Sequence, residues 1–205
     1  MPKQTYPDVW SFEKGAREKG FRQIAGIDEA GRGPLAGPVV SAAVILPEGF
    51  DCPGLTDSKK LSEKKRDALY PKIRELAVAV GVGMADHEEI DRINVLQAAL
   101  LSMKRAMDDL ATTPDYLLID GKFTIDSDLP QEAIVKGDSR SISVAAASII
   151  AKVTRDRIMK ELAQEYPVYG FDRHKGYPTK AHKQAIIDHG PCPVHRRSFR
   201  GVRQE

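Results

Sequence analysis

Two adjacent carboxylates, Asp28 and Glu29, stand at the end of an apolar run, and the sequence Gly31-Arg32-Gly33 follows them almost at once. Magnesium prefers oxygen ligands and is commonly held by one or two carboxylates together with water and phosphate. Glycines on both sides of an arginine allow a bulky polymer to approach the backbone closely. This segment therefore predicts metal-dependent phosphodiester chemistry.

Two further acids, Asp120 and Asp138, also follow predicted strands, and each lies beside a glycine. In open sheets covered by helices, sites form beyond the carboxyl ends of the strands. If the strands are neighbours, all four carboxylates converge, and their mutual repulsion raises their pKa values. A divalent cation removes that penalty, and a pair of cations would clamp the attacking and leaving oxygens of an in-line displacement at phosphorus.

Adjacent residues of a regular strand point to opposite faces. We therefore expect the strand to break at Asp28 and Glu29, with Ala30-Gly31 as the place for the break. Each of the other acids also has a simpler interpretation. Asp120 before a glycine is typical of a turn, and Asp138 is a candidate N-cap of the helix that follows.

The elements that must position these acids follow from hydrophobic periodicity and helix caps. The pattern predicts strands at 23–28, 39–46, 78–85, 116–119 and 133–135. It predicts a short amphipathic helix around Trp10, and helices at 94–110, 141–165, 179–189 and from Ser62 onward. This order favours an α/β fold with a mixed sheet covered by helices and a helical C-terminal part. We expect residues 1–20 to form an N-terminal segment packed on a catalytic domain of residues 21–205.

Composition is that of an ordinary globular protein: 205 residues with a net charge of +2. Local basic clusters at 59–60, at 64–66 and in the tail from His195 to Arg203 are typical of solvated faces and, less often, of nucleic-acid binding. The two cysteines, Cys52 and Cys192, indicate neither a disulfide framework nor a metal site. Because no signal-like or membrane-length apolar run is present, we expect a cytoplasmic protein with no membrane partner.

The loop after Glu29 also matches the dinucleotide fingerprint G-x-G-x-x-A, which requires a helix to open there. Pro34, Pro38 and a β-branched run follow instead, which makes that function improbable. We expect backbone contact with a polymer, in which Arg32 meets a phosphate and exposed amides or carbonyls bond a ribose 2′-hydroxyl. That hydroxyl is how a protein distinguishes RNA from DNA.

A second polar loop, 174–179, places Tyr177 between a glycine and a proline. An exposed aromatic ring there would stack on a base or sugar, although surface tyrosines more often pack locally. His182 and His189 lie seven residues apart, and we interpret both as non-ligands because hard cations prefer oxygen.

Six motifs occur in a characteristic order: GIDEAGRGPLAGPVV, LTDSKKLSEKKR, LLIDG, KGDSRSISVAAASIIAKVTRD, HKGYPTKAH and HRRSF. Together they resemble bacterial ribonuclease HII over almost the whole chain, from Phe21 to Phe199. The resemblance implies a ribonuclease H-like mixed five-stranded sheet flanked by helices, with a helical C-terminal region. It also implies an endonuclease that cuts the RNA strand of RNA/DNA hybrids and nicks 5′ of single ribonucleotides embedded in duplex DNA.

The resemblance assigns roles to individual residues. It implies a monomer that uses two magnesium or manganese ions and leaves 3′-hydroxyl and 5′-phosphate ends. The implied metal ligands and catalytic residues are Asp28, Glu29, Asp120 and Asp138; the implied substrate contacts are Gly31, Arg32 and Gly33 for the 2′-hydroxyl, Tyr177 for a sugar, and Lys59 and Lys60 for phosphate.

Two alternatives remain open on the residues themselves. A junction resolvase or integrase-like nuclease would use the same acids but would cut all-DNA substrates. A non-catalytic hybrid- or DNA-binding protein would bind without metal, but four acids along a phosphate path are poor binding residues without cations.

Overall fold

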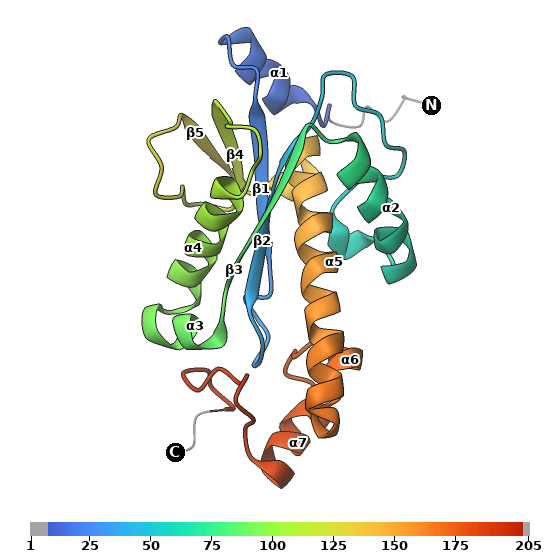
Figure 1. Ribbon diagram of the computed structural model, residues 1–205, viewed down its shortest axis with the longest axis vertical. Coiled ribbons are helices and arrows are strands. Elements are labelled where there is room, and N and C mark those ends of the chain that lie inside the picture. The colour runs from blue at the N-terminus through green and yellow to red at the C-terminus, as the bar shows by residue number, and fades with distance from the viewer. Residues whose placement is uncertain (1–7, 203–205) are drawn as a thin grey trace, which may run out of the picture.

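The computed structural model describes residues 8–202, so part of the predicted N-terminal segment and Arg203 lie outside the described residues. Its centre is a five-stranded mixed sheet with the strand order β3-β2-β1-β4-β5. The strands are β1 (Ile24–Ala30), β2 (Val39–Ile45), β3 (Ala79–Ala85), β4 (Tyr116–Asp120) and β5 (Gln131–Ile134). The predicted α/β fold and each predicted strand are confirmed (Figure 1).

Strand β1 joins the antiparallel part of the sheet to its parallel part. It pairs antiparallel with β2, and it pairs parallel with β4, where Ile27 faces Ile119. Strand β5 continues the parallel part beside β4. The carboxyl ends of β1, β4 and β5 therefore reach the same edge of the sheet, which is where ligand sites of open α/β sheets lie.

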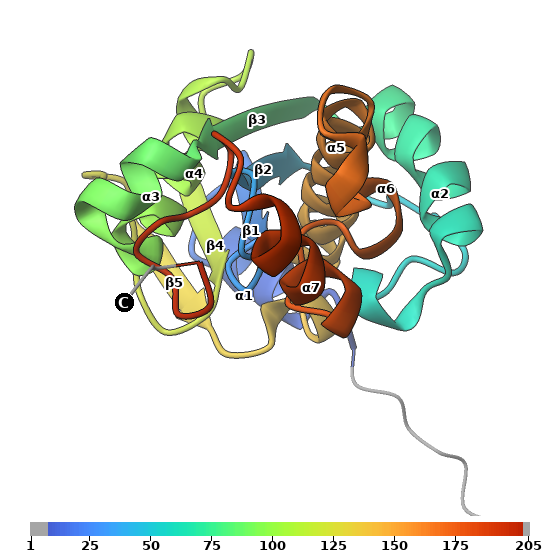
Figure 2. The same ribbon diagram turned by 90° about the horizontal axis from the view of Figure 1, so that it is seen from below.

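Helices cover both faces of the sheet (Figure 1). The α-helices are α1 (Ser11–Glu18), α2 (Glu63–Leu76), α3 (His87–Ile93), α4 (Val95–Asp108), α5 (Ile142–Glu165), α6 (Phe171–His174) and α7 (Lys180–His189), and the 3₁₀ turns are η1 (Ser58–Lys60), η2 (Gly137–Ser139) and η3 (Pro167–Tyr169). Helix α5 packs on β1 and β2 from one face, and α4 packs on β1, β2 and β3 from the other. Seen from below, α6, α7 and the C-terminal segment lie under one end of this sandwich (Figure 2). None of the helices within residues 8–202 is long and apolar enough to cross a bilayer.

A glycine sets the distance between β1 and α5. A Cβ atom on Gly26 would lie 2.2 Å from the carbonyl carbon of Ser143, so any larger residue would push the helix away from the strand. The first turn of α5 is therefore held against β1, two residues before Asp28. This close approach brings the segment that precedes α5 to the carboxyl edge of the sheet.

The first turn of α5 is capped mainly by another part of the chain. Glu13 of α1 is buried, and its Oε1 accepts hydrogen bonds from Ser141 Oγ (2.6 Å), Ser143 Oγ (2.6 Å) and Ser143 N (3.1 Å). The Ile142 amide donates to Val9 O (2.9 Å). The N-cap residue itself is Ser141, so the interpretation of Asp138 as the cap was wrong by three positions. Helix α1 and the residue Val9 before it thus satisfy two of the amides that any helix leaves open at its start.

We expect Glu13→Ala to destabilise the protein by about 1–2 kcal/mol, because an N-cap acceptor is lost and buried donors are left unpaired. Urea unfolding of the two proteins measures this difference. Glu18→Ala, at the exposed end of the same helix, is the matched control and should change the free energy of unfolding by less than about 0.5 kcal/mol. Equal values for Glu13→Ala and Glu18→Ala would contradict the capping role.

One predicted helix differs from the structure. The helix predicted at 94–110 begins at Val95, with Asn94 as its N-cap, and a separate helix α3 precedes it. Asn94 has a φ of 69°, and this left-handed residue turns the chain between the two helices. A signal for α3 was present in the sequence, because Asp86 and Glu89 form a capping box.

Candidate active site

Three carboxylates meet at the carboxyl edge of the sheet. Oxygens of Asp28, Asp120 and Asp138 all lie within 4.8 Å of one another. Asp28 shares a strand face with Gly26, which contacts α5, and Asp120 shares a face with Leu118, which packs on Val144 of α5. Both acids therefore face the helix that begins just after Asp138.

Backbone contacts fix two of these acids. Asp120 Oδ1 accepts a hydrogen bond from the Gly137 amide at 2.6 Å, which ties the end of β4 to the turn that carries Asp138. Asp28 Oδ1 accepts from the Glu29 amide at 2.7 Å. Two of the three acids are thus oriented before any cation arrives, which is what a preorganised site requires.

The predicted break in β1 at Asp28 and Glu29 is wrong. The β1–β2 ladder continues through both residues to Ala30, because β2 supplies partners that keep the chain extended. Glu29 consequently points to the α4 face and stays outside the three-acid cluster, and its Oε1 lies 3.4 Å from Arg32 Nη1. Glu29 still interacts with the cluster through its charge. Burial raises the pKa of Glu29, Arg32 lowers it and Asp120 raises it, and the net effect is a raised pKa.

The carboxylates of the cluster are buried or half-buried, and they repel one another. Asp28 is only 2% exposed, and burial followed by the charges of Glu29 and Asp120 raises the pKa of its carboxyl well above 3.8. Burial and the charge of Asp120 also raise the pKa of Asp138. Buried carboxylates that repel one another are stabilised by a cation, and their hard oxygen atoms match magnesium or manganese. The donor set therefore fits a divalent metal.

Lys59 is the only cation within 4.0 Å of this cluster among residues 8–202, with Nζ 3.3 Å from Asp138 Oδ2. Burial alone would lower the pKa of Lys59, but Asp28 and Asp138 raise it above its usual value. Lys60, the other predicted phosphate ligand, lies 4.0 Å from Asp57 instead. The structure therefore brings Lys59 to the acids and leaves Lys60 apart from them.

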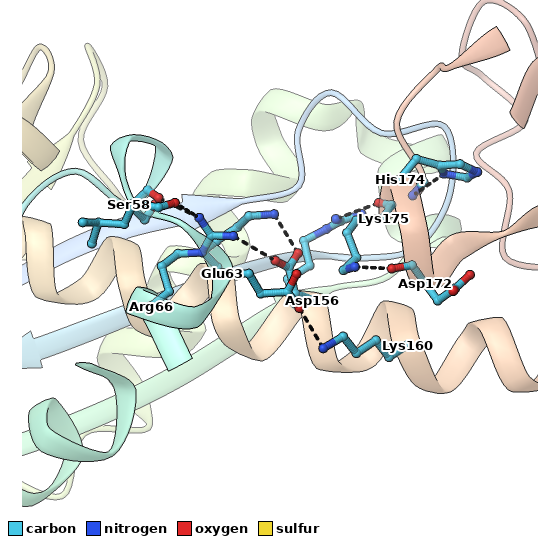
Figure 3. Close-up of polar contacts among 12 residues, drawn as sticks. Ser58, Glu63, Arg66, Asp156, Lys160, Asp172, His174 and Lys175 are labelled. Atoms are coloured by element: carbon cyan, nitrogen blue, oxygen red, sulfur yellow. Dashed lines mark hydrogen bonds and ion pairs between the residues drawn. The ribbon is translucent and has the colours of Figure 1, made fainter. Parts of the chain in front are cut away.

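The segment that carries Lys59 is fastened to α5. Ser58 Oγ lies 2.7 Å from Ser148 Oγ, and Arg66 donates to the Ser58 carbonyl at 3.0 Å. Arg66 also lies 3.8 Å from Asp156 of α5 (Figure 3). One long helix thus supports both Lys59 and, through its first turn, Asp138.

Two buried arginines hold the loop that contains Gly31, Arg32 and Gly33. Arg196 is 0% exposed and donates to the carbonyls of Gly31 (2.6 Å), Arg32 (3.1 Å), Pro34 (2.7 Å) and Gly37 (2.9 Å). Burial lowers its pKa to about 9, which still leaves it charged at neutral pH. Arg155 binds the same loop further on, through the carbonyls of Ala36 and Pro38.

The prediction that the basic tail is a solvated face was therefore wrong for Arg196, and Arg155 was missed. A guanidinium offers five N–H donors in a planar fork, which suits a loop whose carbonyls turn inward. Two prolines remove amides from this loop, so its carbonyls need donors from elsewhere. This shortage of amide donors was the signal in the sequence that could have indicated buried arginines.

The two polar loops expected to contact substrate form one continuous surface. Tyr177 is 44% exposed, as predicted, and a Cβ on Gly33 would lie 3.5 Å from its ring. The Leu35 amide donates to the Gly176 carbonyl at 2.8 Å, and Arg155 donates to the Lys175 carbonyl at 3.0 Å. The aromatic ring and the glycine loop therefore cannot move independently.

Comparison with known proteins agrees with this arrangement. The family model for ribonuclease HII matches residues 25–202. The chain is 60% identical over 196 residues to ribonuclease HII of Geobacter metallireducens, covering 96% of this chain and 92% of that protein. It is 57% identical over 200 residues to ribonuclease HII of Enterococcus faecalis, covering 98% and 78%. The chain belongs to the ribonuclease HII family.

Ribonuclease HII proteins are metal-dependent endoribonucleases, and the acids at 28, 120 and 138 form a cluster that could hold a metal ion. The crystal structure of ribonuclease H2 from Pyrococcus horikoshii is similar, with a TM-score of 0.74 and 28% identity. The match covers 89% of this chain and 96% of that one. The expected ribonuclease H-like fold is thereby confirmed.

Proposed function

We propose that this member of the ribonuclease HII family hydrolyses the RNA strand of RNA/DNA hybrids and nicks 5′ of single ribonucleotides embedded in duplex DNA. The observation that carries the proposal is the position of the three-acid cluster beside a rigid glycine loop that can contact ribose. Such an enzyme serves ribonucleotide removal and replication. We propose that it acts as a monomer in the cytoplasm.

In this proposal, Asp28, Asp120 and Asp138 would hold a divalent cation, magnesium or manganese. Glu29, which lies outside the cluster but close enough to interact with the charge of Asp120, would complete the ligand set for a second cation. When bound, the cations supply an activated water and stabilise the charge on the departing 3′-oxygen. The acids act chiefly as metal ligands, and the Glu29 and Gly137 amides already orient two of the carboxylates, Asp28 and Asp120. In this proposal the Lys59 ammonium, which lies 3.3 Å from Asp138, contacts a substrate phosphate; its position beside the acids supports that role.

Ribose recognition in this proposal uses amides rather than carbonyls. The Gly31 and Arg32 carbonyls already accept from Arg196, whereas the Arg32 and Gly33 amides find no backbone or side-chain acceptor within residues 8–202. A free amide beside a loop held by buried guanidinium groups can donate to a 2′-hydroxyl. The proposal assigns to Tyr177, next to Gly33, stacking on the neighbouring sugar, and its exposed ring supports that role.

The chemistry of the product ends tests this mechanism. We expect a hybrid labelled on the RNA strand to yield 3′-hydroxyl and 5′-phosphate ends with magnesium or manganese, and no cleavage with EDTA. Attack by a water leaves these ends, whereas attack by the neighbouring 2′-hydroxyl would leave a 2′,3′-cyclic phosphate and a 5′-hydroxyl. Cyclic ends, or cleavage that persists in EDTA, would contradict the proposal.

A further inference from the structure

A buried chain of hydrogen bonds runs from the C-terminal segment to Tyr177. Cys192 N and Sγ both lie 3.0 Å from His195 Nδ1. His195 Nε2 lies 3.0 Å from His182 Nε2, and His182 Nδ1 lies 2.9 Å from the Tyr177 carbonyl. Both histidines are 0% exposed. The metal site uses none of these side chains.

The partners fix a single arrangement of protons along this chain. A carbonyl only accepts, so His182 must carry its proton on Nδ1, which leaves Nε2 bare. His195 must then donate from Nε2, so its Nδ1 is bare and accepts from the Cys192 amide. Every link is satisfied only when both rings are neutral, with His182 in the Nδ1–H form and His195 in the Nε2–H form.

The surroundings keep the rings neutral. Burial, then the neighbouring His182, lowers the pKa of His195 to about 4, and burial also lowers the pKa of His182. His174 stacks on His182 with ring centroids 4.6 Å apart, and Phe171 packs edge-on against it. A proton added to His182 would place two N–H groups against each other across the 3.0 Å between the two Nε2 atoms. A proton added to His195 would do the same across the 3.0 Å between its Nδ1 and the Cys192 amide.

The Tyr177 loop needs such support because it follows an unfavourable backbone conformation at Lys175. Lys175 has a φ of 52°, which is unfavourable for a residue with a Cβ, whereas Gly176 adopts its φ of 84° without that cost. The Tyr177 carbonyl accepts from Thr179 N at 2.8 Å as well as from His182. Since the Tyr177 side chain is exposed, these backbone bonds carry much of its orientation.

We propose that His182 is a positioning residue for Tyr177, with its ring held in the required tautomer by His195 and Cys192. This inference rests on the proposed role of Tyr177 in substrate binding. It implies that specificity for ribonucleotide-containing duplex depends on residues beneath the surface that substrate never touches.

Nitrogen-15 NMR of the histidine side chains tests the chain in the free enzyme. We expect His182 to be neutral with the proton on Nδ1 and His195 to be neutral with the proton on Nε2 at pH 7. The Nδ1–H form is the minor one for a free imidazole, so it is diagnostic of the bond to the Tyr177 carbonyl. A charged His182, or His182 protonated on Nε2 alone, would overturn the proposal.

A double-mutant cycle tests the function. Tyr177→Ala should lower kcat/KM on a duplex with one ribonucleotide about 10- to 100-fold, through lost stacking. His182→Leu should lower it about 3- to 10-fold through KM, as expected for one lost hydrogen bond. In the Tyr177→Ala background, His182→Leu should have no further effect, because the two residues act through one ring. His182→Asn, whose amide can still donate to the Tyr177 carbonyl, should restore most of the affinity.

His189→Leu, at an exposed position of the same helix, is the matched control. Suppose that Tyr177→Ala lowers kcat/KM. If His182→Leu then leaves kcat/KM unchanged, or if it adds its full effect in the Tyr177→Ala background, the positioning role is wrong and the proposed function stands. If Tyr177→Ala leaves kcat/KM unchanged, Tyr177 does not bind substrate, and the positioning role falls with that assignment.

Discussion

Asp28→Asn is expected to abolish cleavage, with kcat falling by more than about 1,000-fold, since several kcal/mol of transition-state stabilisation depends on bound metal. The reason is the position of Asp28 in the cluster with Asp120 and Asp138. Initial rates on a hybrid with magnesium measure the loss. Asp126→Asn, an exposed acid outside the cluster, is the control and should retain wild-type turnover. Unchanged turnover in Asp28→Asn would remove it from the metal site.

The same substitution should stabilise the metal-free protein. The folded-state pKa of Asp28 is raised above its ordinary value of 3.8, so the native state binds more protons than the unfolded chain between these two values. The free energy of unfolding therefore falls as pH rises through that window. Asn does not ionise, so in EDTA at neutral pH the variant should have a higher Tm than wild type, and its Tm should depend less on pH. A lower Tm would contradict the account of charge repulsion.

Gly31→Ala and Gly33→Ala should have different effects although they lie two residues apart. Gly31 has a φ of 105°, and its Cβ would lie 2.1 Å from Arg155 Nε. Alanine should therefore disrupt the hydrogen bonds by which Arg155 holds this loop. We expect a loss of about 1–3 kcal/mol in the free energy of unfolding from strain alone, together with loss of activity. Denaturant unfolding and cleavage rates measure the two effects separately.

Gly33→Ala should leave the fold intact, because the nearest atom to its Cβ is the Tyr177 ring at 3.5 Å. A methyl group there would meet the substrate, and we expect kcat/KM on a single-ribonucleotide duplex to fall about 10- to 100-fold, as for an overpacked contact of 1–3 kcal/mol. If Gly33→Ala retained full activity, the glycine loop would not approach substrate. If Gly31→Ala were as stable as wild type, the hydrogen bonds from Arg155 to the loop would contribute little to the stability of the protein.

Much of the fold was predictable because the local signals agree with the tertiary structure. Ser62 and Thr179 cap the helices predicted to begin beside them. Three of the four acids meet as predicted, because parallel strands bring their carboxyl ends to one edge. The position of the fourth acid, Glu29, depends on strand pairing. Strand β2 keeps Glu29 extended, and the sequence around Glu29 does not predict that pairing.

The interior supports of the site were not predictable in the same way. Arg155 and Arg196 look like surface residues by type, and only the folded loop reveals the carbonyls that they satisfy. Glu13 caps a helix that begins more than a hundred residues later in the chain. Such contacts join segments far apart in sequence, and periodicity within a segment carries no information about them.

The most direct test of the account uses two DNA duplexes that differ by one oxygen atom, a single ribonucleotide in one and the matching deoxyribonucleotide in the other. The account predicts a magnesium-dependent nick on the 5′ side of the ribonucleotide, no cleavage of the all-DNA duplex, and no cleavage of either in EDTA. Equal cleavage of both duplexes would contradict ribose recognition by the glycine loop, and would indicate a metal-dependent DNA nuclease built on the same acids.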